Sequence, residues 1–489
     1  MIAIQAEFRP AIPNVYGAAD YREFRAILLH MDTMLNAGLA EELVQGWLAK
    51  WKLTRVGVVT SKRLALMWRY AHYVLRCNVA RHLMGLPFRE FSVRLADSEL
   101  LQWFCSISIW GQRKACSKSS LERYDKWFDI EKLERVIRDQ LNGLQEPEKA
   151  RALAGREAGL RIDEIFADST CVKANIHYPV DWVLLRDGTR SLIAAIVTIR
   201  RQGLKHRMPL PSEFVTRINR LCIRMTHSRR RKDGRKYRKL VLREMKALAK
   251  LVKRHGERYR ELLEARWQET EWTEKQAKVV IKRIDNVLEK LPKAIEQAHE
   301  RIIGERRVKN ADKLLSLYEE DVHVLVRGKA DAEVEFGNGL YLAEQRDGLI
   351  VDWELFRDHP PADSHLVKKS LKRIEENYGS VAAYCGDRGF DTKANAAHLA
   401  SENIFNGICP KSPAALAESA KEPRFMELQR RRGQTEARIG IFKNAYLGRP
   451  LRSKGFDHKR NTVAWCVLTH NLWVLARMKI ASEQQCMAA

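Results

Sequence analysis

The order of apolar and charged segments after residue 160 limits the possible folds more than any other feature of this sequence. Short apolar runs rich in β-branched residues begin there, and a long, highly charged helical region over 201–318 interrupts them. Beyond it the order is strand, strand, helix, strand, helix, strand, helix. Strands that first form a meander and then alternate with helices predict a mixed five-stranded sheet covered by helices, an α/β fold of the mixed α+β kind.

Individual segments of this sheet can be placed from their patterns. The runs at 334–344 and 348–356 are separated by a short polar stretch and predict a hairpin. The run at 191–199 is either an apolar helix or a buried strand, because periodicity alone does not distinguish the two. The other expected elements are strands at 162–166, 322–327, 381–386 and 403–409, and helices at 364–378 and 392–401.

The region from residue 20 to about 150 has helical apolar spacing and no strong alternating segments. Near its end, Ser119-Ser-Leu-Glu122 is a capping-box pattern that predicts the start of a helix with Arg123, Tyr124 and Lys126 exposed. Short helices of this kind form either a helix-turn-helix DNA reader or a helical bundle without DNA contact. The predicted divisions are a helical N-terminal DNA-binding domain at 1–155, a catalytic domain at 156–480, the basic helical insertion at 201–318 within it, and a tail at 481–489.

Positive charge is concentrated in one part of the chain. The 87 Lys and Arg against 61 Asp and Glu give a formal charge of +26. Residues 201–260 hold 21 of these cations and only 4 acids. A localised basic block favours a polyanionic partner, DNA before a membrane, and the alternative is a set of merely solvated helix faces.

The nine cysteines are scattered singly, without a C-x-x-C pair. This usage fits a reducing cytosol and argues against a disulfide framework or a zinc ribbon. The N-terminus lacks the basic-then-apolar order of a signal peptide, and no apolar run approaches the length of a membrane span. We therefore expect a soluble, cytoplasmic protein without a membrane partner.

Three carboxylates are the candidate catalytic residues. Asp168 and Asp387 each follow an apolar, β-branched run, and Glu436 lies in a helical pattern near the C-terminus. If the strands that precede the two aspartates are neighbours, both side chains lie at one edge of the sheet. Carboxylate oxygens suit Mg²⁺ or Mn²⁺, and such sites commonly hold two ions. In this interpretation Asp168 bridges the ions, while Asp387 and Glu436 each bind one.

Two cations accompany Glu436. Arg432, Glu436 and Lys443 stand at offsets of zero, four and eleven, which fall within about 40° of one another on a continuous α-helix. Beside metal ions, Arg432 and Lys443 would hold backbone phosphates. The pattern alone also fits an ordinary surface ion pair.

Four patches resemble a known family. They are Ala167-Asp-Ser-Thr170 with Ala174-Asn-Ile-His-Tyr-Pro-Val-Asp181, Arg327-Gly-Lys with Val334-Glu-Phe-Gly337, Cys385-Gly-Asp-Arg-Gly-Phe390, and Arg431-Arg-Gly-Gln-Thr-Glu-Ala-Arg-Ile-Gly-Ile-Phe-Lys443. In this order they resemble insertion-sequence DDE transposases whose third acidic residue lies in a Y-x2-R-x3-E-x6-K signature. The resemblance extends from about residue 160 to 480.

The resemblance implies a ribonuclease H-like core, Mg²⁺ dependence, and DNA strand cleavage and transfer at terminal inverted repeats. It assigns the metal triad to Asp168, Asp387 and Glu436. Because two DNA ends are brought together during transposition, we also expect a homodimer on DNA. The signature's tyrosine position is Gln429 here, which can hydrogen-bond a phosphate but cannot stack on a base. The side chains expected to contact DNA phosphates are Arg432, Lys443, Arg388 and Gln429.

Some assignments stay open at this stage. His177 lies nine residues after Asp168 and either touches DNA, positions water, or packs locally. A nuclease without strand transfer would use the same carboxylates. A DNA-binding protein with a decayed triad would not need them.

Overall fold

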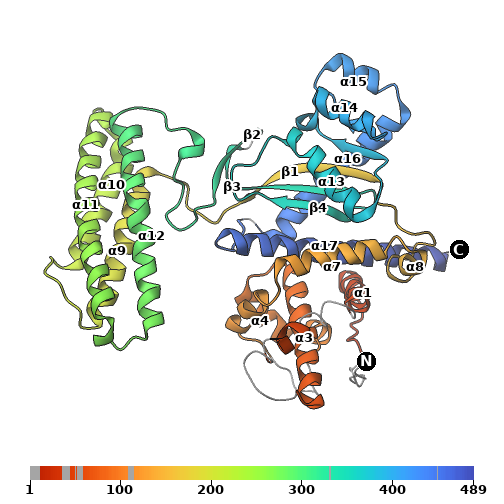
Figure 1. Cartoon of the computed structure of the whole chain (residues 1–489), viewed down its shortest axis with the longest axis horizontal. Coiled ribbons are helices and arrows are strands. Elements are labelled where there is room, and N and C mark those ends of the chain that lie inside the picture. Colours follow the sequence, from red (N-terminus) through yellow and green to blue (C-terminus); the bar gives the residue numbers. More distant parts are fainter. Residues whose placement is uncertain are drawn as a thin grey trace. The chain divides into compact units, whose positions relative to one another are not determined.

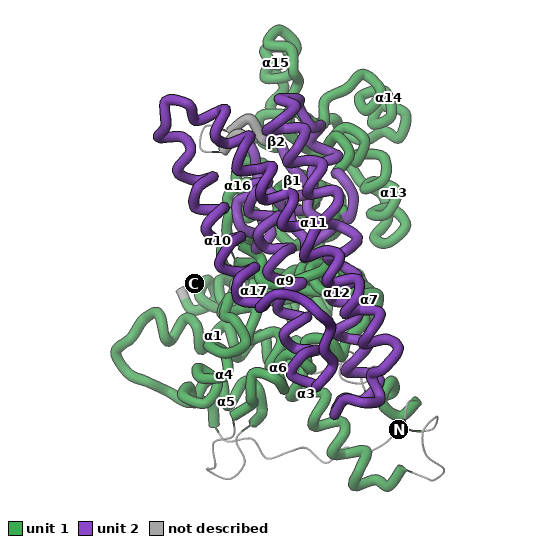
Figure 2. Tube along the Cα trace, turned by 90° about the vertical axis from the view of Figure 1, so that its left-hand side faces the viewer, with its two compact units in different colours: residues 1–172, 339–356, 360–489 green, residues 173–338, 357–359 purple. Residues whose placement is uncertain are grey.

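The computed structural model describes residues 11–35, 44–49, 51, 59–107, 115–329, 332–448 and 450–488. The chain forms two compact units (Figures 1 and 2). Unit 1 contains residues 1–172, 339–356 and 360–489, and unit 2 contains residues 173–338 and 357–359. Unit 2 therefore begins earlier and ends later than the predicted insertion at 201–318. No helix among the described residues combines the length and the apolar character that crossing a bilayer requires.

The first part of unit 1 is helical. Thr60 and Ser98 cap the starts of α3 and α5 by accepting hydrogen bonds from the backbone N–H groups of Arg63 and Leu101. Gly155 ends α8 in the left-handed conformation (φ 67°) that glycine adopts most readily. The helices are α1 (Ala19–Met34), α3 (Ser61–Leu83), α4 (Phe88–Asp97), α5 (Glu99–Phe104), α6 (Lys118–Asp125), α7 (Ile130–Gly143) and α8 (Pro147–Ala154).

Helix α6 differs from its prediction. Its N-cap is Ser117, whose hydroxyl accepts from the backbone of Ser120, so the capping box expected at Ser119 is wrong. Tyr124 is 4% exposed rather than a surface residue, because it packs edge-on against the rings of Tyr73 and Trp127. This helix therefore offers fewer exposed side chains than the predicted recognition helix required.

The sheet has six strands, one more than predicted, and it is mixed. Strands β1, β5 and β6 are parallel neighbours, whereas β3 pairs antiparallel with both β2 and β4. The full order is β2–β3–β1–β5–β6, with β4 also paired to β3. The predicted hairpin of β3 and β4 is confirmed. The strands are β1 (Glu164–Lys173), β2 (His323–Lys329), β3 (Ala332–Gln345), β4 (Ile350–Leu355), β5 (Ala383–Gly386) and β6 (Phe405–Ile408).

Helices cover both faces of the sheet within unit 1. On one face, Tyr341 of β3 donates a hydrogen bond to Ser370 of α13, and Ser370 donates to Asp352 of β4. On the other face, Leu428 of α16 packs against Phe166 of β1. The helices and helical turns of this part are η5 (Asp363–His365), α13 (Val367–Tyr378), η6 (Arg388–Phe390), α14 (Lys393–Ser401), α15 (Pro413–Ser419), α16 (Pro423–Ile441), the π-helical η7 (Phe442–Leu447) and α17 (Phe456–Ala488).

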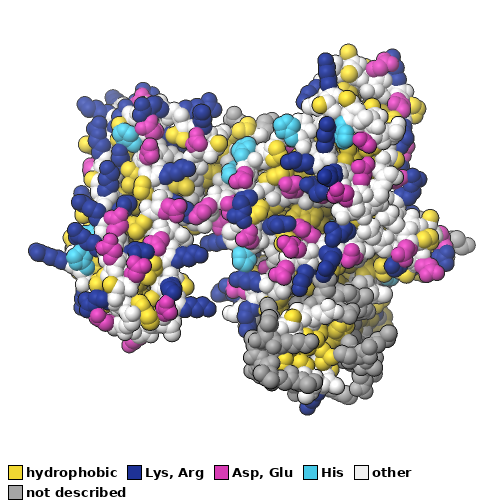
Figure 3. Space-filling model, in the orientation of Figure 1, with side chains coloured by type: hydrophobic (Ala, Val, Ile, Leu, Met, Phe, Trp, Pro, Cys, Tyr) yellow, Lys and Arg dark blue, Asp and Glu magenta, His cyan; other side chains and the backbone are white. Residues whose placement is uncertain are grey.

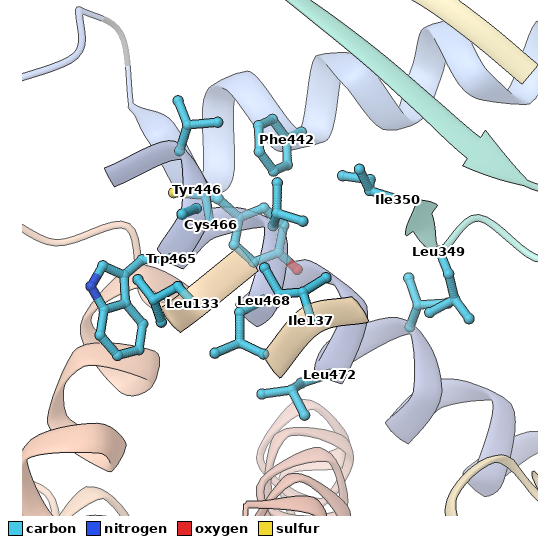
Figure 4. Close-up of a cluster of buried hydrophobic side chains, with 14 of the residues drawn as sticks. Leu133, Ile137, Leu349, Ile350, Phe442, Tyr446, Trp465, Cys466, Leu468 and Leu472 are labelled. Carbon is cyan, nitrogen blue, oxygen red and sulfur yellow. The ribbon is translucent and has the colours of Figure 1, made fainter. Parts of the chain in front are cut away.

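Helix α17 runs through the main core of unit 1. Its central residues Trp465, Cys466 and Leu468 are buried. Figure 4 shows them gathered with side chains of α7, of η7 and of the start of β4. Leu133 and Ile137 come from α7, and Phe442 and Tyr446 come from η7. Burying such side chains contributes roughly 1.5–3 kcal/mol each, so this cluster joins the N-terminal helices to the C-terminal helix.

Unit 2 is a four-helix bundle followed by a strand pair. Its buried core comes from all four helices, which settles residues 191–199 as helical rather than a strand. Asp181, at the start of α9, is buried and accepts hydrogen bonds from Arg301 and Gln297 at 2.9 Å, so it ties α9 to the end of α12. The helical elements are α9 (Asp181–Arg201), α10 (Pro211–His227), η1 (Ser228–Arg230), α11 (Gly234–Arg266), η2 (Trp267–Glu269), α12 (Glu274–Ala298), η3 (His299–Ile303) and η4 (Asn310–Asp312).

A buried charge cluster in unit 1 makes stability depend on pH. Asp125 accepts a hydrogen bond from Arg81 at 2.7 Å, and its Oδ1 lies 3.7 Å from Nε2 of His82. Burial lowers the pKa of His82 from 6.5 to about 4, and the charge of Arg81 adds to this effect against the opposing pull of Asp125. The folded protein therefore holds His82 neutral at a pH where the unfolded chain protonates it.

We expect the free energy of unfolding to fall as the pH drops from about 6.5 to about 4. The stabilisation from neutral His82 is complete above its pKa in the unfolded chain, about 6.5, and is lost as the pH approaches its pKa in the folded chain, about 4. The free energy of unfolding changes by about 3 kcal/mol between these values. Urea unfolding across this range measures it. His82→Gln should flatten the dependence, whereas His177→Gln, at an exposed position, should not. Identical pH dependence in the wild type and His82→Gln would contradict the assignment.

Candidate active site

Asp168 and Asp387 lie on neighbouring parallel strands. The register of β1 and β5 pairs Glu164 with Ala383 and Phe166 with Cys385. Continued by two residues, it sets Asp168 level with Asp387, whose backbone is still extended (φ −78°, ψ −176°). Adjacent strands are about 4.8 Å apart, so the two aspartates are neighbours across the strand pair. The condition stated from the sequence, that the strands before the two aspartates are neighbours, is therefore met.

The sequence predicted that Asp168 ends its strand, and this prediction is wrong because Asp168 lies within β1. β1 continues to Lys173, and Thr170, Cys171 and Val172 are buried beyond it. The polar Asp-Ser-Thr stretch interrupted the apolar pattern, although the backbone stays extended through it. Asp168 is half-buried, and its Oδ1 accepts from the backbone N–H of Ser169 at 2.7 Å.

Asp387 is held at the end of β5 by the turn that follows it. Its Oδ1 caps η6 by accepting from the backbone N–H of Gly389 at 2.8 Å. A Cβ at Gly389 would stand 2.8 Å from Asp363 Oδ2 and 2.9 Å from Asp387 Oδ1. These two carboxylate oxygens are therefore less than about 6 Å apart, a separation bounded by that geometry. No pattern in the sequence singled out Asp363, which comes to this position through η5.

Helix α16 covers the face of the sheet on which both aspartates lie. Phe166, Ala383, Cys385 and Leu428 form one buried cluster. Because side chains alternate along a strand, Asp168 and Thr170 share the face of Phe166, and Asp387 shares the face of Cys385. α16 thus brings its own polar residues over the two strands.

One stripe of α16 anchors the helix to β3. Glu344, with a side chain 4% exposed, accepts from Arg431 at 2.9 Å, Thr435 at 2.7 Å and Arg438 at 3.2 Å. The Arg431 guanidinium also lies 4.6 Å from the centre of the Phe166 ring. Glu344 appeared in the sequence only as the end of a predicted strand, and its partners on α16 gave no signal there.

A second stripe of α16 lies on the β6 side. Gln429 donates to the backbone carbonyl of Gly407 in β6 at 2.6 Å and accepts from Arg432 at 3.1 Å. Arg432 then donates to Glu436 at 2.9 Å, and Glu436 is 58% exposed. This stripe therefore carries the predicted residues Gln429, Arg432 and Glu436 as one hydrogen-bonded chain.

The charge of Arg432 influences the Cys385 thiol in β5. Burial raises the pKa of the Cys385 thiol to about 12, and Glu164 adds to the increase, whereas Arg431, Arg432 and Arg424 act in the opposite direction. Cys385 stands two residues before Asp387. Three guanidinium groups of α16 thus act on the electrostatics of β5 near its end.

Lys443 reaches the same strand as Asp168, but from a different helical geometry. α16 ends at Ile441, and Lys443 lies in the π-helical η7. The expectation that Arg432, Glu436 and Lys443 share one α-helical face is therefore wrong for Lys443, because the wider π-turn changes its direction. The ammonium group is buried and donates to Thr170 Oγ1 at 2.9 Å, two residues beyond Asp168.

Two further predicted site residues, Arg388 and His177, are exposed. Arg388 follows Asp387 directly in η6. His177 belongs to unit 2 and precedes α9. Arg327, part of one patch of the family resemblance, has a side chain outside the described residues. Glu335 pairs with Lys173 at 3.1 Å within unit 2.

The donor chemistry fits a hard divalent cation only in part. Asp168 and Asp387 supply carboxylate oxygens side by side, as Mg²⁺ prefers. In the portion of the chain described by the structure, no three or more His, Cys, Asp or Glu side chains are grouped to hold a metal ion. Glu436 instead pairs with Arg432, so the three predicted ligands are positioned around one strand pair without forming a closed set.

No protein-family model, curated protein or solved structure matches this chain.

Proposed function

We propose that this protein is a DDE-type DNA transposase with a ribonuclease H-like core. The observation that carries the proposal is the level placement of Asp168 and Asp387 on neighbouring parallel strands under a helix with Arg432 and Glu436. The strand order β4–β3–β1–β5–β6 supports the fold assignment, since parallel pairs lie on one side of β1 and the antiparallel pair of β3 and β4 on the other. The family resemblance adds strand transfer to the reaction.

In this proposal, Asp168 and Asp387 hold Mg²⁺ or Mn²⁺ beside the scissile phosphate. Ions bound there would supply the positive charge that stabilises a phosphodiester during cleavage. Asp387 is prepared for this role because Gly389 fixes one of its oxygens and leaves the other available. One oxygen of Asp168 accepts a hydrogen bond from the N–H of Ser169.

Arg432 and Glu436 neutralise each other in the DNA-free chain. A backbone phosphate would compete with Glu436 for the guanidinium, since arginine binds phosphate through two parallel hydrogen bonds. Glu436 is largely exposed, so it can leave Arg432 without breaking a packed contact. We infer that DNA binding releases this carboxylate toward the aspartates as the third ligand.

The test is a product assay with purified full-length protein, Mg²⁺ and a duplex carrying the sequences that flank its reading frame. We expect nicked strands and, in addition, strands joined to a second duplex. Nicked products alone would reduce the proposal to a nuclease. Binding without any cleavage would leave a DNA-binding protein with a decayed triad and would overturn the enzymatic proposal.

A further inference from the structure

Helix α11 of unit 2 carries an exposed row of cations, none of which forms an ion pair with a carboxylate among the described residues. Seven positions between residues 236 and 258 are spaced by four or three residues, so they lie within about 40° of one line along the helix. All seven are exposed, and none is acidic. The row consists of Lys236, Arg243, Lys250, Arg254 and Arg258, with Leu240 and Ala247 between them. We call these five cations the α11 ridge.

The opposite side of α11 explains why the ridge is straight and exposed. Val241, Met245, Leu248, Val252 and Tyr259 are buried in the core of the bundle. A 33-residue helix held along its length by such contacts keeps the outward row fixed. The five cations therefore extend over about 33 Å in a defined line. Figure 3 shows Lys and Arg side chains along the outer edge of this bundle.

The acids nearest to the ridge form ion pairs with cations outside it, including Asp233, which pairs with Arg231. Between residues 234 and 258 the sequence has two carboxylates, Glu244 and Glu257. Glu244 pairs with Arg224 of α10 at 3.0 Å, and Glu257 pairs with Lys253. Within the described residues, no carboxylate forms an ion pair with any of the five ridge cations. The ridge thus keeps its full charge of five.

Neighbouring groups respond to this charge. Burial lowers the pKa of Lys246, and the nearby Lys250 and Arg243 lower it further. Burial likewise lowers the pKa of His255, with further contributions from Arg258, His206 and Arg254. Like charges held together without counter-charges cost free energy in the unbound chain. A polyanionic partner would remove that cost.

We propose that the α11 ridge binds the phosphate backbone of duplex DNA without reading its sequence. About 33 Å of duplex carries roughly 20 phosphate charges, which is more than enough to engage the five cations of the ridge. The ridge has no aromatic side chain on which unpaired bases could stack, and its single exposed Leu240 is too little apolar surface for a membrane interface. The choice of DNA as the polyanion rests on the proposed function. The inference that the ridge binds a polyanion rests only on its exposed cations.

The test compares two matched variants of the full-length protein. In the ridge variant, Lys236, Arg243, Lys250, Arg254 and Arg258 are all changed to Gln. In the control variant, five exposed cations of α12 are changed to Gln, and there the cations alternate with acids such as Glu274 and Glu289. The control residues are Lys275, Lys278, Lys282, Arg283 and Lys293. Both variants lose the same net charge from the same unit.

Binding is measured by fluorescence anisotropy with a random duplex of about 20 base pairs, in EDTA, between about 50 and 200 mM salt. We expect the ridge variant to bind at least about tenfold more weakly and to lose about 4.5 from the slope of log affinity against log salt. The control variant should keep most of the wild-type affinity and most of the wild-type salt slope. Circular dichroism and thermal unfolding confirm that both variants are folded.

Each outcome separates the ridge from the proposed function. An unchanged slope in the ridge variant, or equal losses in both variants, would overturn the ridge assignment. A ridge that holds duplex RNA or anionic vesicles but not DNA would overturn the choice of partner. Binding is measured in EDTA and therefore does not depend on cleavage. Wild-type protein that binds DNA through the ridge in EDTA, yet does not cleave it with Mg²⁺, would contradict the proposed function and leave the ridge assignment intact.

Discussion

Asp387→Asn is expected to abolish Mg²⁺-dependent strand cleavage and to leave duplex binding intact. The amide keeps the hydrogen bond to the N–H of Gly389, so the turn after β5 is preserved, while the negative charge that holds a divalent cation is lost. We expect a loss of at least about 10²-fold in single-turnover cleavage, the size typical of removing one preorganised electrostatic group. Asp168→Asn should behave in the same way.

Two comparisons keep this prediction specific. Glu418→Gln removes an exposed carboxylate from α15 and should cleave at the wild-type rate. Glu436→Gln should lose cleavage as Asp387→Asn does, because its carboxylate is the third proposed ligand. Full activity in Asp387→Asn would refute the site. Full activity only in Glu436→Gln would confine the metal ligands to the two strands.

Glu344→Ala is expected to destabilise unit 1 by about 3–5 kcal/mol. The substitution leaves Arg431, whose side chain is 10% exposed, without its carboxylate partner, and it removes the acceptor of Thr435. An uncompensated buried charge is the costliest result of breaking such a pair. Urea unfolding followed by circular dichroism measures the change.

A matched exposed pair provides the control for Glu344. Glu427 pairs with Arg346, and both side chains are more than half exposed. Glu427→Ala should therefore cost less than about 1 kcal/mol. If Glu344→Ala costs no more than Glu427→Ala, the buried network does not anchor α16.

Elements with long, uniform patterns could be predicted from the sequence. The strand expected at 381–386 is β5 at Ala383–Gly386, and the helix expected at 392–401 is α14 at Lys393–Ser401. Both follow from an apolar run or a helical period that local neighbours do not disturb. The strand expected at 322–327 is β2 at His323–Lys329, so the predicted total of five was one lower than the number of strand segments identified.

Features that depend on distant partners could not be predicted. Thr170 looks like part of a polar loop until Lys443, far along the chain, covers it. Glu344 looks like a surface acid until α16 folds over it. Tyr124 looks like an exposed contact residue until the rings of Tyr73 and Trp127 enclose it. Periodicity describes one element at a time, whereas these burials come from packing between elements.

The two stripes of α16 have a consequence for how such a protein can change over generations. Arg431, Thr435 and Arg438 hold the helix in place through Glu344, while Gln429 and Arg432 lie on the β6 side. Because the buried carboxylate of Glu344 anchors the first stripe, we expect substitutions on the β6 side to cost less stability than substitutions at Arg431 or Thr435. If the proposed function holds, we expect substitutions at position 429, where glutamine replaces the tyrosine of the resembled signature, to change DNA contacts more than stability.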